Sequence, residues 1–143
     1  MRGGLFNAIT FYRAGCWMRG MHIPIIPRVM EILIYVIFKS IIPLSANIGK
    51  GTFCSHRGIS VVLHRRCSVG NDCIIGTCVT LGGRHEDAPG GPTIGNRVYI
   101  GTGAKILGPI SVGDDVKIGA NAVVLADIPA GKTAVGIPAK IID

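Results

Sequence analysis

Aromatic and acidic residues are scarce in this sequence. Phe, Trp and Tyr make up 6% of the 143 residues, and 15 lysines and arginines outnumber 8 acidic residues, for a net charge of +7. A basic balance favours an anionic partner, such as a nucleic acid, an acidic membrane surface or a phosphorylated ligand. Because the basic residues form no dense run and aromatic side chains are few, nucleic acid is not expected as a partner.

Long apolar stretches are missing as well. A helix that spans a membrane needs about 20 apolar residues, whereas the longest run here, residues 29–38, is far shorter and contains Glu31. We expect this run to form a short helix that packs against the rest of the fold or against a neighbouring subunit. Interfacial attachment to a membrane, helped by Arg13, Arg19 and Arg28, is the less favoured alternative.

Cysteine is limited to 5 residues, an odd number, and the spacing of Cys and His matches no zinc motif. Cys67 and Cys73 fall at positions where the repeat described next places inward-facing residues, so we interpret them as reduced core residues. No signal peptide is evident. A cytoplasmic protein without a metal site is therefore expected.

Glycine, by contrast, is abundant, with 21 residues, and it belongs to a repeat of six. Every sixth residue is aliphatic, in the series Ile94, Ile100, Ile106, Val112, Ile118 and Val124. Four positions after each comes a second small or aliphatic residue: Val98, Ala104, Ile110, Val116, Ala122 and Ile128. A helix repeats its apolar residues at intervals of three and four, and a strand at two. A period of six instead predicts a parallel β-helix, a solenoid whose aliphatic residues stack inside.

Glycine follows four of these aliphatic residues, at Gly95, Gly101, Gly113 and Gly119. We expect these glycines to take backbone angles that other residues resist. The pattern divides the chain into a short helical segment, residues 1–41, and a β-helix with a C-terminal cap, residues 42–143. A chain of this length has room for one domain.

The repeat slips twice, within residues 54–63 and within residues 81–94. Loops carried on a rigid scaffold are common places for function. His56 lies in the first break and His85 in the second, and a neutral imidazole is a natural general base for a hydroxyl. A histidine in a loop can equally be solvated and without a role, so both readings stay open.

Blocks within and around the repeat resemble the serine acetyltransferase branch of the hexapeptide acyltransferases. They are residues 55–58 (SHRG), 79–83 (VTLGG), 99–108 (YIGTGAKILG) and 136–140 (GIPAK), and the likeness runs from about Ile42 to the C-terminus. The resemblance implies a left-handed β-helix, an exception to the usual right-handed crossover. It also implies a homotrimer that binds acetyl-CoA in the groove between neighbouring subunits.

By this resemblance, the protein is an O-acetyltransferase that moves acetyl from acetyl-CoA to an acceptor hydroxyl. L-serine is the nominal acceptor, which would place the reaction in cysteine biosynthesis. His56 is the first candidate for the general base. An alignment without a gap moves His56 by one position, so His64 is a rival, and His85 is the third candidate catalytic residue.

The resemblance also implies contacts to the cofactor. Gly103, Ala104 and Lys105 match the stretch that runs beside the pantetheine arm, and Lys140 is placed to meet phosphate at the nucleotide end. Further contacts are expected at Gly83, Gly119 and Ala120.

Two departures from the family keep other functions open. The aspartate that precedes the family's histidine is Ser55 here, and only about 40 residues precede the first hexad. Short relatives of this kind acetylate sugar hydroxyls, so a sugar or polysaccharide is the alternative acceptor. A non-catalytic hexapeptide scaffold is the alternative of another class, and β-helical carbonic anhydrases, which bind zinc, resemble the chain less well.

Overall fold

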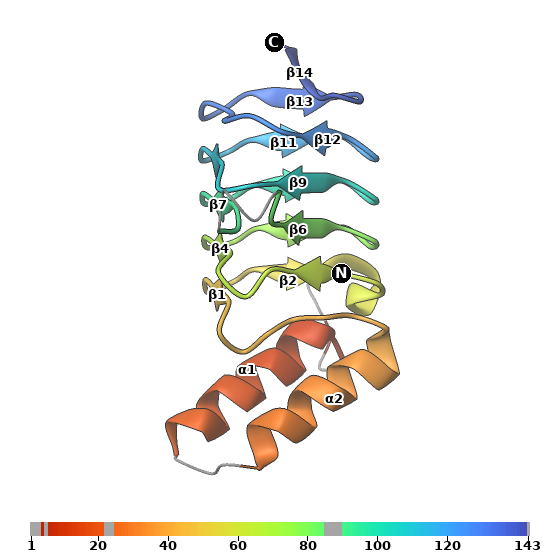
Figure 1. Cartoon of the computed structure of the whole chain (residues 1–143), viewed down its shortest axis with the longest axis vertical. Coiled ribbons are helices and arrows are strands. Elements are labelled where there is room, and N and C mark those ends of the chain that lie inside the picture. Colours follow the sequence, from red (N-terminus) through yellow and green to blue (C-terminus); the bar gives the residue numbers. More distant parts are fainter. Residues whose placement is uncertain (1–3, 5, 22–24, 85–89, 143) are drawn as a thin grey trace.

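The computed structural model describes residue 4 and residues 6–21, 25–84 and 90–142. It is a stack of β-coils that stands on a pair of helices (Figure 1). The helices are α1 (Ala8–Gly20) and α2 (Ile26–Phe38), and they pack against each other. The chain then climbs coil by coil and ends at the far end of the stack.

Short strands form the sides of the stack, and all pair in parallel except β14, which runs antiparallel to β13. Their bounds are β1 Asn47–Ile48, β2 Phe53–Cys54, β3 Val62–Leu63, β4 Ser68–Val69, β5 Ile74–Ile75, β6 Thr80–Gly82, β7 Thr93–Ile94, β8 Tyr99–Ile100, β9 Lys105–Leu107, β10 Ser111–Val112, β11 Lys117–Ile118, β12 Val123–Val124, β13 Thr133–Val135 and β14 Lys140–Ile142. Sheet I is β1-β4-β7-β10, sheet II is β14-β13-β11-β8-β5-β2, and sheet III is β12-β9-β6-β3. The chain passes from sheet I to II to III and back, so three consecutive strands make one coil.

The six-residue period is confirmed as the spacing of successive strands, three of which make one coil. Each strand up to β9 pairs in parallel with the strand three further along, as in Ile75↔Ile100 and Ile100↔Ile118. All six aliphatic residues of the first series are buried. The second series is buried too, except Ile110, which is only partly covered beside Gly108 at its corner. Cys67 and Cys73 are buried, as expected of core residues.

The expectation for the repeat glycines was wrong. Gly95, Gly101, Gly113 and Gly119 do not take positive φ angles, whereas non-glycine corner residues such as Arg97 and Asp115 do. These glycines are needed because successive coils approach closely. A Cβ added at Gly101 would lie 2.6 Å from the backbone nitrogen of Ala120, a distance no real Cβ tolerates.

The apolar run in the N-terminal segment is helical, but its packing differs from the prediction. The helix begins at Ile26, earlier than expected, with Pro27 in its first turn. Only Ile34 and Phe38 of α2 are buried. The expected packing therefore holds for one face of the helix, and the other face is exposed.

Within the described residues, no helix is both long enough and apolar enough to cross a membrane.

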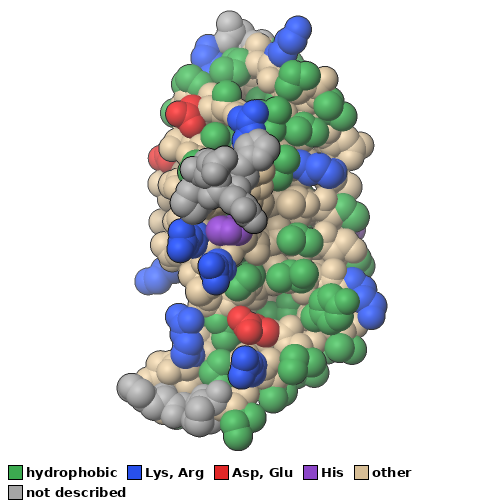
Figure 2. Space-filling model, in the orientation of Figure 1, with side chains coloured by type: hydrophobic (Ala, Val, Ile, Leu, Met, Phe, Trp, Pro, Cys, Tyr) green, Lys and Arg blue, Asp and Glu red, His purple; other side chains and the backbone are tan. Residues whose placement is uncertain are grey.

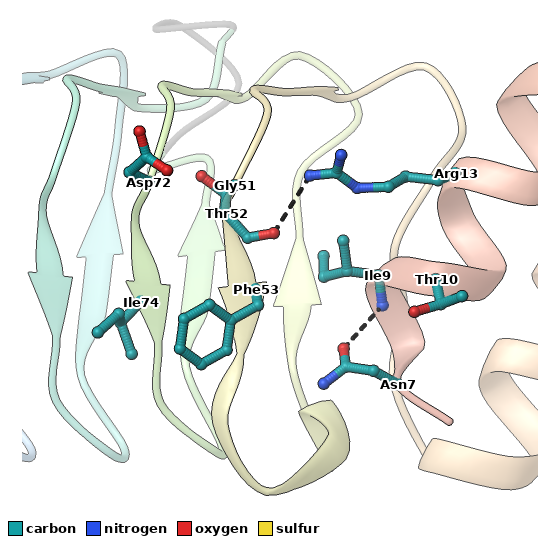
Figure 3. A pocket seen from close by; sticks show the side chains of 9 residues that line it. All are labelled: Asn7, Ile9, Thr10, Arg13, Gly51, Thr52, Phe53, Asp72 and Ile74. Atoms are coloured by element: carbon teal, nitrogen blue, oxygen red, sulfur yellow. Dashed lines mark hydrogen bonds between the residues drawn. The ribbon is translucent and has the colours of Figure 1, made fainter. Parts of the chain in front are cut away.

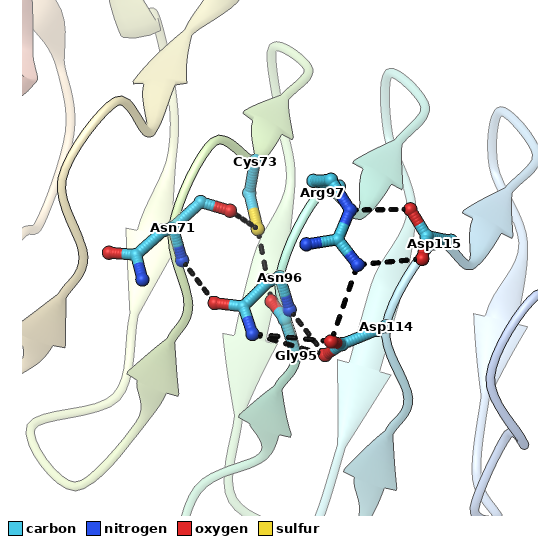
Figure 4. Close-up of polar contacts among 7 residues, drawn as sticks. All are labelled: Asn71, Cys73, Gly95, Asn96, Arg97, Asp114 and Asp115. Carbon is cyan, nitrogen blue, oxygen red and sulfur yellow. Dashed lines mark hydrogen bonds and ion pairs between the residues drawn. The ribbon is translucent and has the colours of Figure 1, made fainter.

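A ladder of side chains runs up the corner between sheets I and II (Figure 4). The Asn71 Oδ1 atom accepts from the Lys50 N–H at 2.8 Å, Asn96 Oδ1 from the Asn71 N–H at 2.9 Å, and Asp114 Oδ1 from the Asn96 N–H at 2.8 Å. Each side chain thus satisfies a corner amide of the coil before it. The Asn96 N–H lowers the pKa of the exposed Asp114 carboxyl below its ordinary value, and Arg97 contacts that carboxylate at 3.5 Å.

We predict that Asn96→Ala lowers the free energy of unfolding by about 1 kcal/mol, because the Asn71 N–H loses its acceptor. Chemical denaturation of the two proteins measures the difference. Asn47→Ala is the matched control, since among the described residues the Asn47 amide reaches only Ser68 Oγ, at 3.4 Å, on the outer face of sheet I. An equal loss in both variants would contradict a role for the ladder.

Candidate active site

Most of the predicted site residues lie along the edge where the chain passes from sheet II to sheet III, here called the II–III edge. The 3₁₀ turn Ser55–Gly58 and the later turns of this edge stack on one another. The Cys78 N–H donates to the Ile59 carbonyl at 3.1 Å, and the Gly103 N–H to the Thr77 carbonyl at 2.8 Å. Neighbouring strands in a sheet lie about 4.8 Å apart, so the edge is a continuous row of turns.

This row unites six of the predicted residues on one edge: His56, Gly103, Ala104, Lys105, Gly119 and Ala120. Lys105 and Ala120 are exposed, whereas Gly103 and Ala104 are buried. Lys140 lies at the far end of the edge, where it pairs with Val135 of the last parallel strand. The structure therefore brings these residues together along one edge of the stack, and their roles stay predictions.

His56 occupies a strained turn. His56, Arg57 and Gly58 have φ angles of 48°, 68° and 81°, and a non-glycine residue pays about 1–3 kcal/mol to hold such an angle. Left-handed residues in succession persist only where the surroundings enforce them, and they cluster at functional sites. The His56 side chain is exposed on the edge.

The helical segment supplies the contacts that enforce this turn. The buried Ser40 hydroxyl donates to the Gly58 carbonyl at 2.5 Å and accepts the Val61 N–H at 2.9 Å. The Asn7 amide donates to the Cys54 carbonyl at 2.7 Å. Gly58 itself has no room for a side chain, since an added Cβ would lie 2.9 Å from the Cβ of Cys54.

Sequence reasoning missed both polar residues of this support. Asn7 caps α1, because its side chain accepts the Ile9 N–H, and an Asn before an apolar run is a recognised helix start. Ser40 carried no such signal, because its contact with Gly58 joins residues that are far apart in the pattern.

Ser55, which replaces the family's aspartate, does not orient the imidazole. Its hydroxyl donates to the Ile75 carbonyl at 3.2 Å. Among the described residues, no carboxylate bonds to the His56 side chain. Any such group would have to come from elsewhere.

His64 and Gly83 lie on a different edge, where the chain passes from sheet III to sheet I, here called the III–I edge. A Cβ added at Gly83 would lie 3.9 Å from His64 Nε2. His64 Nδ1 accepts the Arg66 N–H at 3.2 Å. A neutral imidazole that accepts at Nδ1 carries its proton on Nε2, so in this arrangement His64 offers a donor at Nε2. His85 lies outside the described residues.

A separate cavity of about 410 Å³ opens between α1 and sheet II (Figure 3). Arg13 and Asp72 flank it, and Phe53 and Ile74 form its apolar part. Arg13 Nη2 donates to the Gly49 and Thr52 carbonyls at 2.9 and 3.2 Å, which ties α1 to the first coil. None of the predicted site residues that the structure describes lines this cavity. Among the described residues, no group of His, Cys, Asp and Glu could hold a metal ion.

Comparison with known proteins decides the family. Residues 91–126 match the family described as bacterial transferase hexapeptide (six repeats). A serine acetyltransferase of Helicobacter pylori is 45% identical over 137 residues, which are 95% of this chain and 80% of that protein. The chain belongs to the serine acetyltransferase family.

Two further serine acetyltransferases are similar to this chain and support the same family. That of Synechococcus elongatus is 39% identical over 138 residues, which are 96% of this chain and 56% of that protein. The structure of the Brucella abortus serine acetyltransferase in complex with coenzyme A aligns with a TM-score of 0.87 at 34% identity, covering 94% of this chain and 54% of that one. The chain thus spans about half the length of these two relatives.

We predict that Ser40→Ala lowers the free energy of unfolding by about 1–3 kcal/mol, because it leaves the buried Gly58 carbonyl and Val61 N–H without their partner. Hydrogen exchange should also quicken at the Val61 amide. Ser45→Ala is the control, since the exposed Ser45 hydroxyl bonds only the Arg65 carbonyl, at 3.1 Å, within the part of the chain that the structure describes. If Ser40→Ala and Ser45→Ala unfold alike, the turn is held by other contacts.

Proposed function

We propose that the chain is an acetyl-CoA-dependent O-acetyltransferase, with L-serine as its nominal acceptor and His56 as its general base. The observation that carries this is the position of His56 in a strained turn, on the same edge as Gly103, Lys105 and Ala120. Family membership supports the reaction, and the complex of the Brucella protein with coenzyme A supports acetyl-CoA as the donor.

In the proposed reaction, the His56 imidazole takes the proton from the acceptor hydroxyl as its oxygen attacks the thioester carbonyl. Backbone N–H donors stabilise the tetrahedral oxyanion, which is typically worth a few kcal/mol. The carbon–sulfur bond then breaks, and the imidazolium returns the proton to the leaving CoA thiolate. The products are an acetyl ester and free CoA.

The donor would lie along the II–III edge. Its reactive end would be at His56, its pantetheine arm beside Gly103, Ala104 and Lys105, and its nucleotide end at Lys140. The Lys105 ammonium already donates to the Gly103 carbonyl at 2.9 Å and has further protons to offer an anionic or carbonyl oxygen.

We further propose a homotrimer in which the II–III edge of one subunit faces the III–I edge of the next. This is supported by the division of the predicted residues between two edges of sheet III, with His64 and Gly83 on the second. His64 then completes a neighbour's site as a donor through Nε2–H. The cytoplasmic location and the absence of bound metal stay predictions.

A sugar hydroxyl is the second candidate acceptor. It is favoured by Ser55, which leaves His56 without the adjacent carboxylate of the family motif. Release of free CoA from acetyl-CoA, with L-serine and a panel of sugars supplied separately, tests both. Release driven by serine supports the first candidate, and release driven only by a sugar supports the second. A protein that binds acetyl-CoA but releases none with any acceptor would be a scaffold.

We predict that His56→Ala lowers turnover at least about a hundredfold, as expected for removal of a general base. The assay is CoA release at saturating acetyl-CoA. Oligomeric state and CoA affinity should be unchanged, because the His56 side chain is exposed and carries no core packing. His64→Ala is the comparison, and near-normal turnover of His56→Ala would assign the role to His64 or His85.

We also predict that CoA protects Cys78 from alkylation. Cys78 is the exposed thiol of the II–III edge, between the His56 turn and Gly103. Burial raises the pKa of Cys54 to about 12 and of Cys67 to about 11, so those thiols should react slowly.

Mass spectrometry after brief labelling, with and without CoA, measures the protection. The half-buried Cys16, which lies on α1, serves as the internal control. Equal labelling of Cys78 in both samples would place CoA elsewhere.

A further inference from the structure

The α2 helix turns an apolar face away from the protein. The residues of this face are spaced by four, three and four positions in the sequence, so their side chains lie along one side of the helix. Here called the α2 stripe, they are Ile25, Val29, Ile32 and Val36, which are 72%, 43%, 58% and 55% exposed. The buried Ile34 and Phe38 lie on the opposite side of the helix. Among the residues that the structure describes, the stripe is therefore left exposed.

Exposed apolar side chains are concentrated at this end of the molecule. Figure 2 shows them over the helices, with both basic and acidic side chains among them. Trp17 and Met21, at the end of α1, are 66% and 54% exposed. Soluble monomers rarely expose large apolar patches unless another surface covers them.

The charged side chains beside the stripe are mainly positive. Arg28, Tyr35 and Lys39 follow one border of it, at intervals of seven and four residues, and all are exposed. Glu31 is the only acidic residue between Asn7 and Lys39. It lies one helical turn from Arg28 and from Tyr35, is half-buried, and its carboxylate accepts the Leu44 N–H at 2.9 Å. The border therefore offers two exposed cations, Arg28 and Lys39, beside one carboxylate that is already hydrogen-bonded within the fold.

We propose that the α2 stripe docks on an anionic membrane surface, with the helix lying in the plane of the interface. An apolar face bordered by Arg and Lys is the pattern of interfacial helices, and exposed aromatic residues such as Trp17 and Tyr35 favour the headgroup level. The helix has 13 residues, about 20 Å at 1.5 Å per residue, too short for a hydrocarbon core of about 30 Å.

Charge decides between a membrane and a second copy of the chain. Pairing two α2 stripes would bring Arg28 and Lys39 of both copies together, and like charges repel. An anionic lipid surface attracts the same residues. The position of the helices at one end of the stack also leaves the II–III edge uncovered (Figure 1).

The test is flotation of the full chain with vesicles of phosphatidylcholine, with or without phosphatidylglycerol. We expect binding to the anionic vesicles only, weakened by salt because surface charges are screened. Ile25→Ser/Ile32→Ser and Arg28→Gln/Lys39→Gln should each lower binding at least about tenfold. All four side chains are exposed, so the fold is not at risk.

Matched controls lie on the solenoid. Tyr99→Ser/Ile142→Ser removes apolar side chains of similar exposure, and Lys50→Gln/Lys117→Gln removes the same charge. Both should bind as the wild type does. Equal loss in the lysine control would mean non-specific attraction and would overturn the proposal. Absence of vesicle binding would also overturn the proposal. If light scattering shows a larger assembly that Ile25→Ser/Ile32→Ser dissociates, a second copy of the chain is the occupant of the stripe.

Discussion

Backbone hydrogen bonds between successive coils are the constraint on which the rest of the structure depends. Strands of two or three residues have no stability alone, and here each strand from β1 to β13 is paired in parallel with its equivalent in a neighbouring coil. The spacing of the strands, about 4.8 Å, repeats every side chain in a row. One row is the aliphatic interior, another is the Asn and Asp ladder of the I–II corner, and a third is the II–III edge. The candidate site is therefore a product of the same periodicity that forms the core.

The site lies where that periodicity fails. A regular coil would pass from sheet II to sheet III with one left-handed residue, as it does at Cys78 and Asn121. The first coil instead has three left-handed residues in succession, at residues 56–58. Its connection from sheet II to sheet III is also longer than in the later coils. This arrangement needs contacts that the solenoid cannot provide. Ser40 and Asn7 of the helical segment provide them, so the helices contribute to the site without lying in it.

How much of the fold and of the candidate site could be predicted from the sequence depends on how far apart in the chain the interacting residues lie. The inward positions of Ile94 and Ile100 could be predicted because burial in a solenoid depends on a residue's place in its own hexad. The role of Gly101 could not, because its close neighbour is Ala120 in the next coil. The contact between Ser40 and Gly58 is likewise non-local.

The histidines show the same limit. Alignment left His56 and His64 as rivals because an alignment without a gap moves His56 one position away from the family histidine. Geometry separates them, since strand β3 lies between and places them on opposite edges of sheet III. The sequence could not separate the two histidines, because their positions depend on the direction in which the chain turns at each corner of the coil.

The position of His56 along its edge joins the two proposals. The His56 turn belongs to the first coil, directly beside α1, whereas Lys140 belongs to the last strand (Figure 1). A donor bound along the edge would carry its acetyl group at the helical end and its nucleotide at the far end. If the α2 stripe rests on a membrane, the reacting centre is the part of the edge nearest the lipid, and an acceptor held at the surface could reach it. Acceptor choice would then be set by the helical end as well as by His56.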